Sequence, residues 1–221
     1  MTEAEREAFV LGQTAPAAPP LVPEVTLHLA SAITPIWEAT EVSLARSGVE
    51  PPYWAFAWPG GQALARFVLD DPALVRDRRV LDFAAGCGLA AIAAAKAGAA
   101  HVLAAELDPL AATAARLNAA ANGVAIETEA SNLLAAPPSG WDVILAGDVC
   151  YEARMTARVV PWLRQAADAG TLVLLADPGR AYLPRGGIEA VAAYDVPVTR
   201  ELEDRELRRT VIYRLSGTSG A

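Results

Sequence analysis

Cysteine, histidine and lysine are all scarce in this chain of 221 residues, and each scarcity excludes something. Two cysteines, Cys87 and Cys150, are too few for a disulfide framework, and the two histidines lie in unrelated segments. Since no Cys/His spacing of a zinc site is present, we expect no metal. Lys96 is the only lysine, and the 18 basic residues are outnumbered by 26 acidic ones, which gives a formal net charge of −8. From this net charge we expect no sequence-independent binding of nucleic acid.

Long apolar runs are also missing. None reaches the roughly 18 residues that a membrane-spanning helix needs. The first residues, MTEAEREAFV, are acidic and do not have the charged-then-apolar pattern of a secretory signal. We therefore expect a soluble, cytoplasmic protein that does not bind membranes. No long amphipathic repeat indicates an oligomer interface, so we expect a monomer.

Hydrophobic residues nevertheless make up 53% of the chain, which suffices for the core of one domain with an appendage. Composition divides the chain into an N-terminal extension over residues 1–50, a main domain over 51–217 and a tail over 218–221. These boundaries follow the proline-rich stretches and the point at which a regular strand and helix rhythm begins.

The sequence of the extension and of the start of the main domain predicts little regular structure. Residues 1–13 predict a short polar helix or a frayed tail, 15–20 a proline-rich linker, and 21–30 a strand. Residues 50–61 are too rich in proline and aromatic residues for regular structure. A helical apolar pattern follows over 62–70.

Beyond this point, short apolar strands alternate with helical patterns. The predicted strands span 78–84, 101–106, 124–130, 141–148, 171–177, 195–200 and 207–215. The predicted helices span 87–98, 109–123, 152–170 and 188–194. This alternation predicts parallel βαβ units, and the charged connection between the last two strands predicts an antiparallel C-terminal hairpin. The expected fold is a doubly wound α/β domain with a seven-stranded, mostly parallel sheet.

A glycine-rich turn joins the first of these strands to its helix in VLDFAAGCGLAAI, residues 80–92. Gly86 and Gly88 let the backbone approach a ligand closely, and the following helix N-terminus directs unpaired N–H groups at it. Gly86, Gly88 and Ala91 also satisfy the G-x-G-x-x-G/A pattern of dinucleotide binders. The turn alone therefore leaves two ligand classes open, a dinucleotide and S-adenosylmethionine.

Acidic residues at the strand ends favour the second class. Asp82 would repel a pyrophosphate but suits a ligand that carries an ammonium and a sulfonium group. Glu106, at the end of the second strand, can accept both ribose hydroxyls in either class, and Asn132 can bond an adenine edge. A simpler interpretation is that Asp82 and Glu106 are ordinary acids at strand ends and that Asn132 forms a turn. Cys87 is interpreted as a small turn residue and not as a nucleophile.

These segments resemble a known family. Residues 82–88, DFAAGCG, followed by AELDP, resemble motif I and the next acidic motif of seven-β-strand methyltransferases. Three further segments, PPYWAFAWPGGQALARFVLD (51–70), ILAGDVCYE (144–152) and ADPGR (176–180), closely resemble the electron transfer flavoprotein β-subunit lysine methyltransferases. The resemblance runs from about Pro51 to Tyr213.

The resemblance implies a Rossmann-like class I methyltransferase, an S-adenosylmethionine cofactor and a protein-lysine acceptor, foremost the electron transfer flavoprotein β subunit. It implies that Asp148 and Tyr151 form the acid-x-x-aromatic motif that lines the approach of the substrate lysine. The cofactor contacts that it implies are Trp58, Asp82, Ala84, Gly86, Gly88, Glu106, Leu107 and Asn132. Glu106 stands where the family commonly has Asp, one methylene shorter.

Structural roles remain open for several of these residues. Asp148 could cap the helix that starts near Glu152, Tyr151 could pack in the core, and Trp58 could anchor its loop. Asp177 and Arg180 are interpreted as a turn ion pair, and a role in the substrate channel rests on the resemblance alone.

Other functions are weighed against lysine methylation. The acceptor could be another protein, such as a ribosomal one, or a small amine. An intact Asp148 and Tyr151 pair counts against a non-catalytic cofactor binder, while Asp82 and the final hairpin disfavour a nicotinamide dehydrogenase. A nucleic-acid methyltransferase is disfavoured because no Asn/Asp-Pro-Pro-aromatic motif follows the fourth strand.

Overall fold

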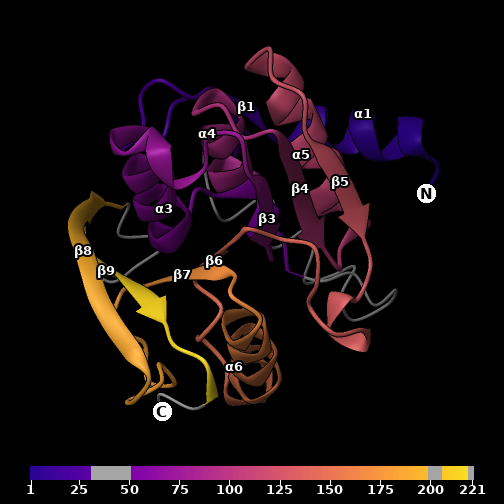
Figure 1. Cartoon of the computed structure of the whole chain (residues 1–221). Helices are drawn as coiled ribbons and strands as arrows, with labels where there is room; N and C mark the ends of the chain where they lie inside the picture. The colour runs from indigo at the N-terminus through magenta and orange to yellow at the C-terminus, as the bar shows by residue number, and fades with distance from the viewer. Residues whose placement is uncertain (31–50, 199–205, 219–221) are drawn as a thin grey trace.

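A seven-stranded sheet forms the centre of the computed structural model, which describes residues 1–30, 51–198 and 206–218 (Figure 1). The strand order is β5-β4-β3-β6-β7-β9-β8. The strands β3 to β7 pair in parallel with one another, whereas β9 runs antiparallel to both β7 and β8. This confirms the expected fold. Strand bounds are β3 Arg79–Phe83, β4 His101–Glu106, β5 Glu127–Ala130, β6 Val143–Gly147, β7 Leu172–Asp177, β8 Ile188–Pro197 and β9 Leu207–Leu215.

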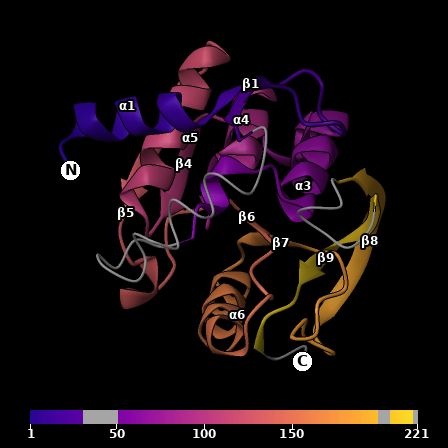
Figure 2. The ribbon, with the colours of Figure 1, turned by 180° about the vertical axis from the view of Figure 1, so that it is seen from behind.

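Helices cover both faces of the sheet, as Figures 1 and 2 show from opposite sides. One face packs against α3 (Pro59–Asp70), α4 (Leu89–Lys96) and α5 (Pro109–Ala121), and the other packs against α6 (Ala153–Asp168). Successive residues of β3 alternate between the two cores, with Val80 on the α4 side and Leu81 on the α6 side. Because both faces are buried, the central strands are continuous apolar runs.

The predicted helix over 188–194 is wrong, because these residues begin the edge strand β8. Alanines favour a helix intrinsically, but Ala190 and Ala192 pair with Tyr213 and Ile212 of β9, with an irregularity between them. Pairing along the whole strand outweighs local propensity. The predicted strand over 195–200 supplies the end of β8, and its last two residues lie outside the described residues.

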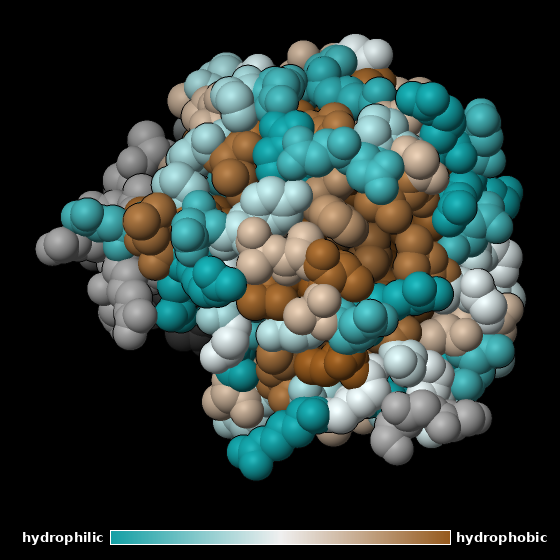
Figure 3. Space-filling model, turned by 60° about the vertical axis from the view of Figure 1, so that its left-hand side comes forward, coloured by the Kyte–Doolittle hydropathy of each residue, from teal (hydrophilic) through white to brown (hydrophobic). Residues whose placement is uncertain are grey.

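The edge strand leaves apolar side chains in contact with solvent. Figure 3 brings the β8 and α3 side of Figure 1 forward and shows hydrophobic residues near the middle of this face, surrounded by hydrophilic ones. On β8, Val191 is 41% exposed. In the part of the chain that the structure describes, no helix has the length and apolarity needed to cross a membrane.

The extension forms more regular structure than the sequence predicts. Helix α1 (Glu3–Gln13) opens with a capping box between Thr2 and Glu5. The expected linker contributes β1 (Ala15–Ala17), which pairs antiparallel with β2 (Leu27–Leu29), so the expected strand over 21–30 shrinks to three residues. Figure 2 shows α1 lying across α5.

Residues of the extension pack on the main domain. Val10 is fully buried in one cluster with Trp54 of the short 3₁₀ helix η1 (Tyr53–Ala55). The Asn118 side chain accepts a hydrogen bond from the backbone N–H of His28 at 2.7 Å. Arg116 forms an ion pair with Glu3 at 2.7 Å. The boundary at residue 50 remains a prediction, since residues 31–50 lie outside the described residues.

Helix α3 begins at Pro59, three residues earlier than the pattern predicts, with Trp58 at the N-cap. Proline suits the first helical position, because its missing N–H would have had no partner within the helix. The helix then approaches the ends of β6 and β7 very closely. A Cβ built on Gly60 would lie 2.5 Å from Asp148 Oδ2 and 2.8 Å from the carbonyl oxygen of Ala176.

We expect Gly60→Ala to destabilise the protein by about 1 to 3 kcal/mol, because neither backbone can retreat without disturbing the sheet. Gly61→Ala is the matched control, since no atom lies within 4 Å of a Cβ built there. Alanine in a helix interior is favoured over glycine by up to about 1 kcal/mol, so this control should match or exceed the parent. Denaturant unfolding measures both, and equal stability of the two variants would contradict the close contact.

Candidate active site

The carboxyl ends of β3, β4 and β6 open into one cavity of 740 Å³. The strand order reverses between β3 and β6, which is the usual position of ligand sites in open α/β sheets. The volume is typical of a small-molecule site. Nine predicted site residues line it, namely Trp58, Asp82, Ala84, Gly86, Glu106, Leu107, Asn132, Asp148 and Tyr151.

The remaining predicted residue, Gly88, does not line the cavity. It caps α4 with a φ of 77°, and a Cβ built on it would lie 2.8 Å from the Cβ of Ala115 in α5. Its lack of a side chain therefore lets two helices pack closely. Gly86, in contrast, has a φ of 52°, and a Cβ placed on it would have no atom within 4 Å. Glycine is therefore favoured at this position by the backbone conformation and not by lack of space.

Two residues with side chains adopt the left-handed conformation at neighbouring strand ends. Ala84 follows β3 and Asp148 follows β6, and each has a φ of 56°. Such a conformation costs an L-residue about 1 to 2 kcal/mol. Both residues line the cavity, so the strained backbone is found where the strands open into it.

Asp82 is the buried carboxylate of the cavity, with an exposed fraction of 3%. One of its oxygens accepts the backbone N–H of Ala91, at 2.8 Å, in the first turn of α4. The pKa of Asp82 is raised to about 7, mainly by burial; the Ala91 N–H opposes this shift and the nearby charge of Glu106 adds to it. A cationic group in the cavity would favour the ionised form of this side chain.

Glu106 connects the first two loops of the site. Its carboxylate accepts the N–H of Gly86 at 2.9 Å and the N–H of Leu107 at 3.0 Å. Burial raises the pKa of this carboxyl, while these two N–H groups lower it. The side chain is therefore oriented by the backbone before any ligand arrives.

Two further predicted contacts combine a structural role with a place in the cavity wall. Asn132 accepts the N–H of Leu134 at 3.2 Å and so caps the 3₁₀ helix η3 (Leu133–Ala135). Trp58 donates its indole N–H to the carbonyl of Tyr53 at 2.9 Å. The Trp58 ring lies 5.8 Å from the ring of Tyr53, centroid to centroid, so Trp58 also holds its own loop together.

Asp148 caps a helix, but the helix is α3 and not the expected α6. Its carboxylate accepts the N–H of Gly60 at 2.6 Å, whereas Glu152 is the N-cap of α6. The Arg180 guanidinium lies 3.3 Å from the other oxygen, and the Asp148 side chain remains 13% exposed. Burial raises the pKa of Asp148 to about 6, while Arg180 and the Gly60 N–H oppose this shift.

The ADPGR segment places Arg180 beside Asp148. Asp177 ends β7 fully buried, and its Oδ1 accepts the N–H groups of Gly179 and Arg180 at 2.7 and 2.6 Å. Asp177 thus fixes the turn through backbone contacts, and the Arg180 side chain is directed to Asp148. Arg180 thus forms an ion pair that joins the turn after β7 to the end of β6.

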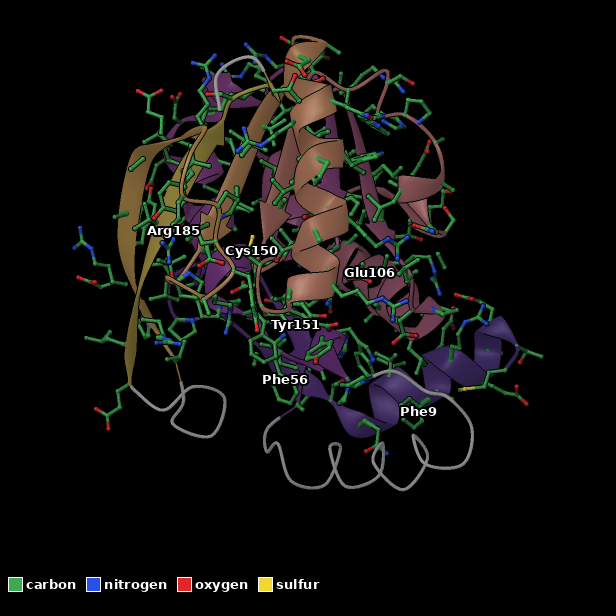
Figure 4. The ribbon with its side chains drawn as sticks, turned by 90° about the horizontal axis from the view of Figure 1, so that it is seen from below. Phe9, Phe56, Glu106, Cys150, Tyr151 and Arg185 are labelled. Atoms are coloured by element: carbon green, nitrogen blue, oxygen red, sulfur yellow. The ribbon has the colours of Figure 1, made fainter. Side chains whose placement is uncertain are left out.

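Tyr151 is not a core residue, since it is 41% exposed. Its ring lies 5.7 Å from that of Tyr53, centroid to centroid, and both line the cavity. In Figure 4, Tyr151 and Phe56 lie together below the start of α6, while Glu106 lies to the right of that helix. The cavity therefore has an acidic half at β3 and β4 and an aromatic half below α6.

Some residues of the cavity wall could not be identified from the sequence. Tyr53, Phe56, Arg154 and Arg158 all line the cavity. Only the position of the arginines, directly after GDVCYE, was a signal that could have pointed to them. Both cysteines are buried, and burial raises the pKa of Cys87 to about 12 and that of Cys150 to about 11, which disfavours the reactive thiolate.

We expect Asp82→Asn to weaken binding of S-adenosylmethionine about 10- to 100-fold, because a hydrogen bond to a charged group contributes about 1.5 to 3 kcal/mol. The parent affinity should rise as pH increases through about 7, where Asp82 ionises, and then level off. The variant should lose this pH dependence. Its amide oxygen can still accept the Ala91 N–H, so the fold is kept.

Calorimetric titration at several pH values measures both effects. The control is Asp71→Asn, an exposed acid outside the cavity, which should leave the affinity unchanged. An unaltered affinity and pH profile in Asp82→Asn would remove Asp82 from the binding site.

Solved structures with a similar fold include methyltransferases. A ribosomal protein L11 methylase from Lactobacillus delbrueckii subsp. bulgaricus superposes with a TM-score of 0.51 at 22% identity, over 73% of this chain and 81% of that chain. Magnesium protoporphyrin IX methyltransferase from Synechocystis PCC 6803, with bound SAM, gives 0.50 at 16% identity, over 71% and 78%. At these identities the likeness concerns the fold alone.

Sequence comparisons are more specific. The model of the family "Ribosomal protein L11 methyltransferase (PrmA)" matches residues 63–175. Relatives named electron transfer flavoprotein beta subunit lysine methyltransferase include those of Xenopus laevis, 43% identical over 79% of this chain and 70% of that protein, and of Homo sapiens, 38% identical over 72% and 61%. With its methyltransferase fold and this similarity over most of its length, the chain belongs to the family of electron transfer flavoprotein β-subunit lysine methyltransferases.

Proposed function

We propose that this enzyme transfers a methyl group from S-adenosylmethionine to a lysine side chain of the electron transfer flavoprotein β subunit. The observation that carries the proposal is a single cavity in which Asp148 and Tyr151 face the same space as Asp82 and Glu106. The names of the relatives, at up to 43% identity, support the acceptor.

The cofactor half of the cavity fits S-adenosylmethionine chemically. Asp82 is a buried carboxylate that a cationic amino-acid end would partner, and Glu106 has oxygens suited to ribose hydroxyls. Asn132 stands after β5, where an adenine edge would lie. The cofactor supplies an electrophilic methyl group, whose bond to sulfur breaks as the lysine nitrogen bonds to it, leaving S-adenosylhomocysteine and releasing a proton to solvent.

The acceptor half orients the amine. The lone pair on nitrogen must point along the axis of the breaking bond, so positioning supplies much of the rate. Asp148 places its carboxylate at the end of β6, and the Gly60 N–H holds it there. A hydrogen bond from the amine to this carboxylate would fix its direction, while Tyr151 and Tyr53 form an aromatic wall that favours cations.

The same carboxylate has an adverse effect on the amine, because a nearby anion raises the pKa of an ammonium group. Free lysine already has a pKa of about 10.4. Arg180, in contact with Asp148, adds a positive charge that counteracts this effect. The pair can therefore orient the amine with less cost to its deprotonation than an isolated carboxylate.

A ribosomal protein is the second candidate acceptor, favoured by the match of the PrmA family model. That match covers residues 63–175, which hold the glycine turn, Glu106 and Asp148 but not Tyr53, Trp58 or Arg180. The PrmA match therefore supports a ribosomal acceptor less strongly than the names of the relatives support the flavoprotein. We also propose a monomeric cytoplasmic enzyme, consistent with two free, buried cysteines.

The proposal predicts methyl transfer from labelled S-adenosylmethionine to lysines of the β subunit when purified enzyme meets its own organism's flavoprotein. Asp148→Asn should lower kcat by at least about 100-fold, since it removes the charge that orients the amine. Its cofactor affinity should stay unchanged. Scintillation counting, calorimetry and mass spectrometry of the labelled peptides measure these quantities.

A parallel reaction with cell lysate is the control for acceptor identity. Label on a different protein would retain the chemistry and reject the flavoprotein as acceptor. Loss of cofactor affinity in Asp148→Asn, equal to the loss of activity, would reject the role of Asp148 in orienting the amine.

Arg180→Gln should move the pH at which kcat is half-maximal upward by about one unit, because the amine and Asp148 both lose a neighbouring positive charge. Arg180→Lys should restore most of the parent profile. Arg185→Gln, an exposed arginine of the same loop, is the matched control and should leave the profile in place. An unshifted profile in Arg180→Gln would show that Arg180 does not influence proton loss.

A further inference from the structure

Two arginines at the beginning of α6 have no part in the reaction derived above. Arg154 and Arg158 both line the cavity and both are exposed. They are four positions apart, so they lie on the same face of the helix. Tyr151 and Met155 line the same wall, which places the two arginines at the rim of the acceptor half.

These positions are unfavourable for the helix itself. Arg154 lies in the first turn, where the helix dipole disfavours a positive charge, and the two like charges at this spacing repel each other. Within the described residues, neither arginine takes part in an ion pair, not even with Glu152 at the N-cap, the nearest acid in sequence. Helix stability therefore does not account for them.

Charge is segregated along the cavity. The cofactor half has three acids, Asp82, Glu106 and Asp108. The acceptor half has more basic than acidic residues, with Arg154, Arg158 and Arg180 against Asp148 and Glu152, in a chain whose net charge is −8. The acceptor lysine is itself a cation before it loses its proton, so the arginines cannot attract it. Negative groups beside that lysine on the protein substrate would give them a favourable contact.

Resting on the proposed function, we infer that Arg154 and Arg158 form a subsite for acidic side chains that flank the acceptor lysine on the protein substrate. A guanidinium group binds a carboxylate through two parallel hydrogen bonds, which gives both attraction and orientation. Such contacts would bring the lysine to Asp148 in a defined register. They would also discriminate against lysines in basic surroundings.

The experiment compares the parent enzyme with Arg154→Glu/Arg158→Glu on the intact flavoprotein. We expect the KM for the acceptor to rise roughly tenfold, as like charges meet across the rim, with the KM for S-adenosylmethionine unchanged. Added salt should raise the KM for the acceptor more steeply in the parent enzyme than in the variant. Arg154→Lys/Arg158→Lys should keep most of the affinity. Arg76→Glu/Arg78→Glu, which changes two exposed arginines outside the cavity, is the control matched in net charge.

The acceptor provides the complementary half of the test. Acidic residues that adjoin the labelled lysine are replaced by Asn or Gln, which should raise KM in the parent enzyme but add little in the Arg154→Glu/Arg158→Glu variant. An unchanged acceptor KM in this double variant would overturn the subsite and leave the proposed function intact. Competition by inorganic phosphate that the double variant abolishes, with neutralised acceptor acids having no effect, would assign the rim to a phosphate group and also overturn it.

Failure of the proposed function has a separate signature. If the parent labels another protein and not the flavoprotein, the acceptor is wrong, and the same KM comparison on the labelled protein decides the subsite. If the parent labels nothing in flavoprotein or lysate, both inferences fall.

Discussion

The contact between the first turn of α3 and the carboxylate of Asp148 is the constraint on which the site depends. Gly60 has no room for a side chain, and its N–H is bonded to Asp148, so the helix start and the end of β6 are positioned together. The same helix begins directly after Trp58, whose loop forms a wall of the cavity. The orientation of the Asp148 carboxylate, the shape of the cavity and the packing of the sheet therefore depend on one close approach of two backbones. A carboxylate that serves as a helix cap cannot rotate freely, which suits a group that must hold an amine in one direction.

Electrostatics divides the cavity in a way that matches its two ligands. Buried acids stand where a cationic donor would lie, and their pKa values are raised because burial disfavours their charge. At the acceptor side, the carboxylate of Asp148 has a positive neighbour in Arg180. In the proposed reaction, the methyl donor would meet carboxylates that form no salt bridge within the described residues, and the amine would meet one that does. This difference allows one cavity to favour a cation at one end and a neutral nucleophile at the other.

Much of this arrangement could be predicted from the sequence, and the exceptions have physical causes. The glycine turn, Asp82 and Glu106 follow from the alternation of strands and helices, since the carboxyl ends of parallel strands meet at one edge. The helix predicted over 188–194 failed because pairing with β9 outweighs the preference of alanine for helices. Neither the partner of Asp148 in α3 nor the position of Arg180 beside it is a local property, because each joins segments distant in sequence. The rim arginines resemble an ordinary solvated helix face until the fold sets them beside the cavity.

The position of β9 has a consequence for how the molecule assembles. This last strand of the sheet inserts between β7 and β8, so β7 has an open edge until the C-terminal segment is in place. The cofactor half is built from β3 and β4 and their helices, which come earlier in the chain. Arg180 follows β7, directly at that late edge. During synthesis, which proceeds from the N-terminus, the donor half can therefore form first and the acceptor half is completed last. Substitutions that disrupt the C-terminal hairpin would accordingly impair methyl transfer by disturbing the acceptor half of the cavity.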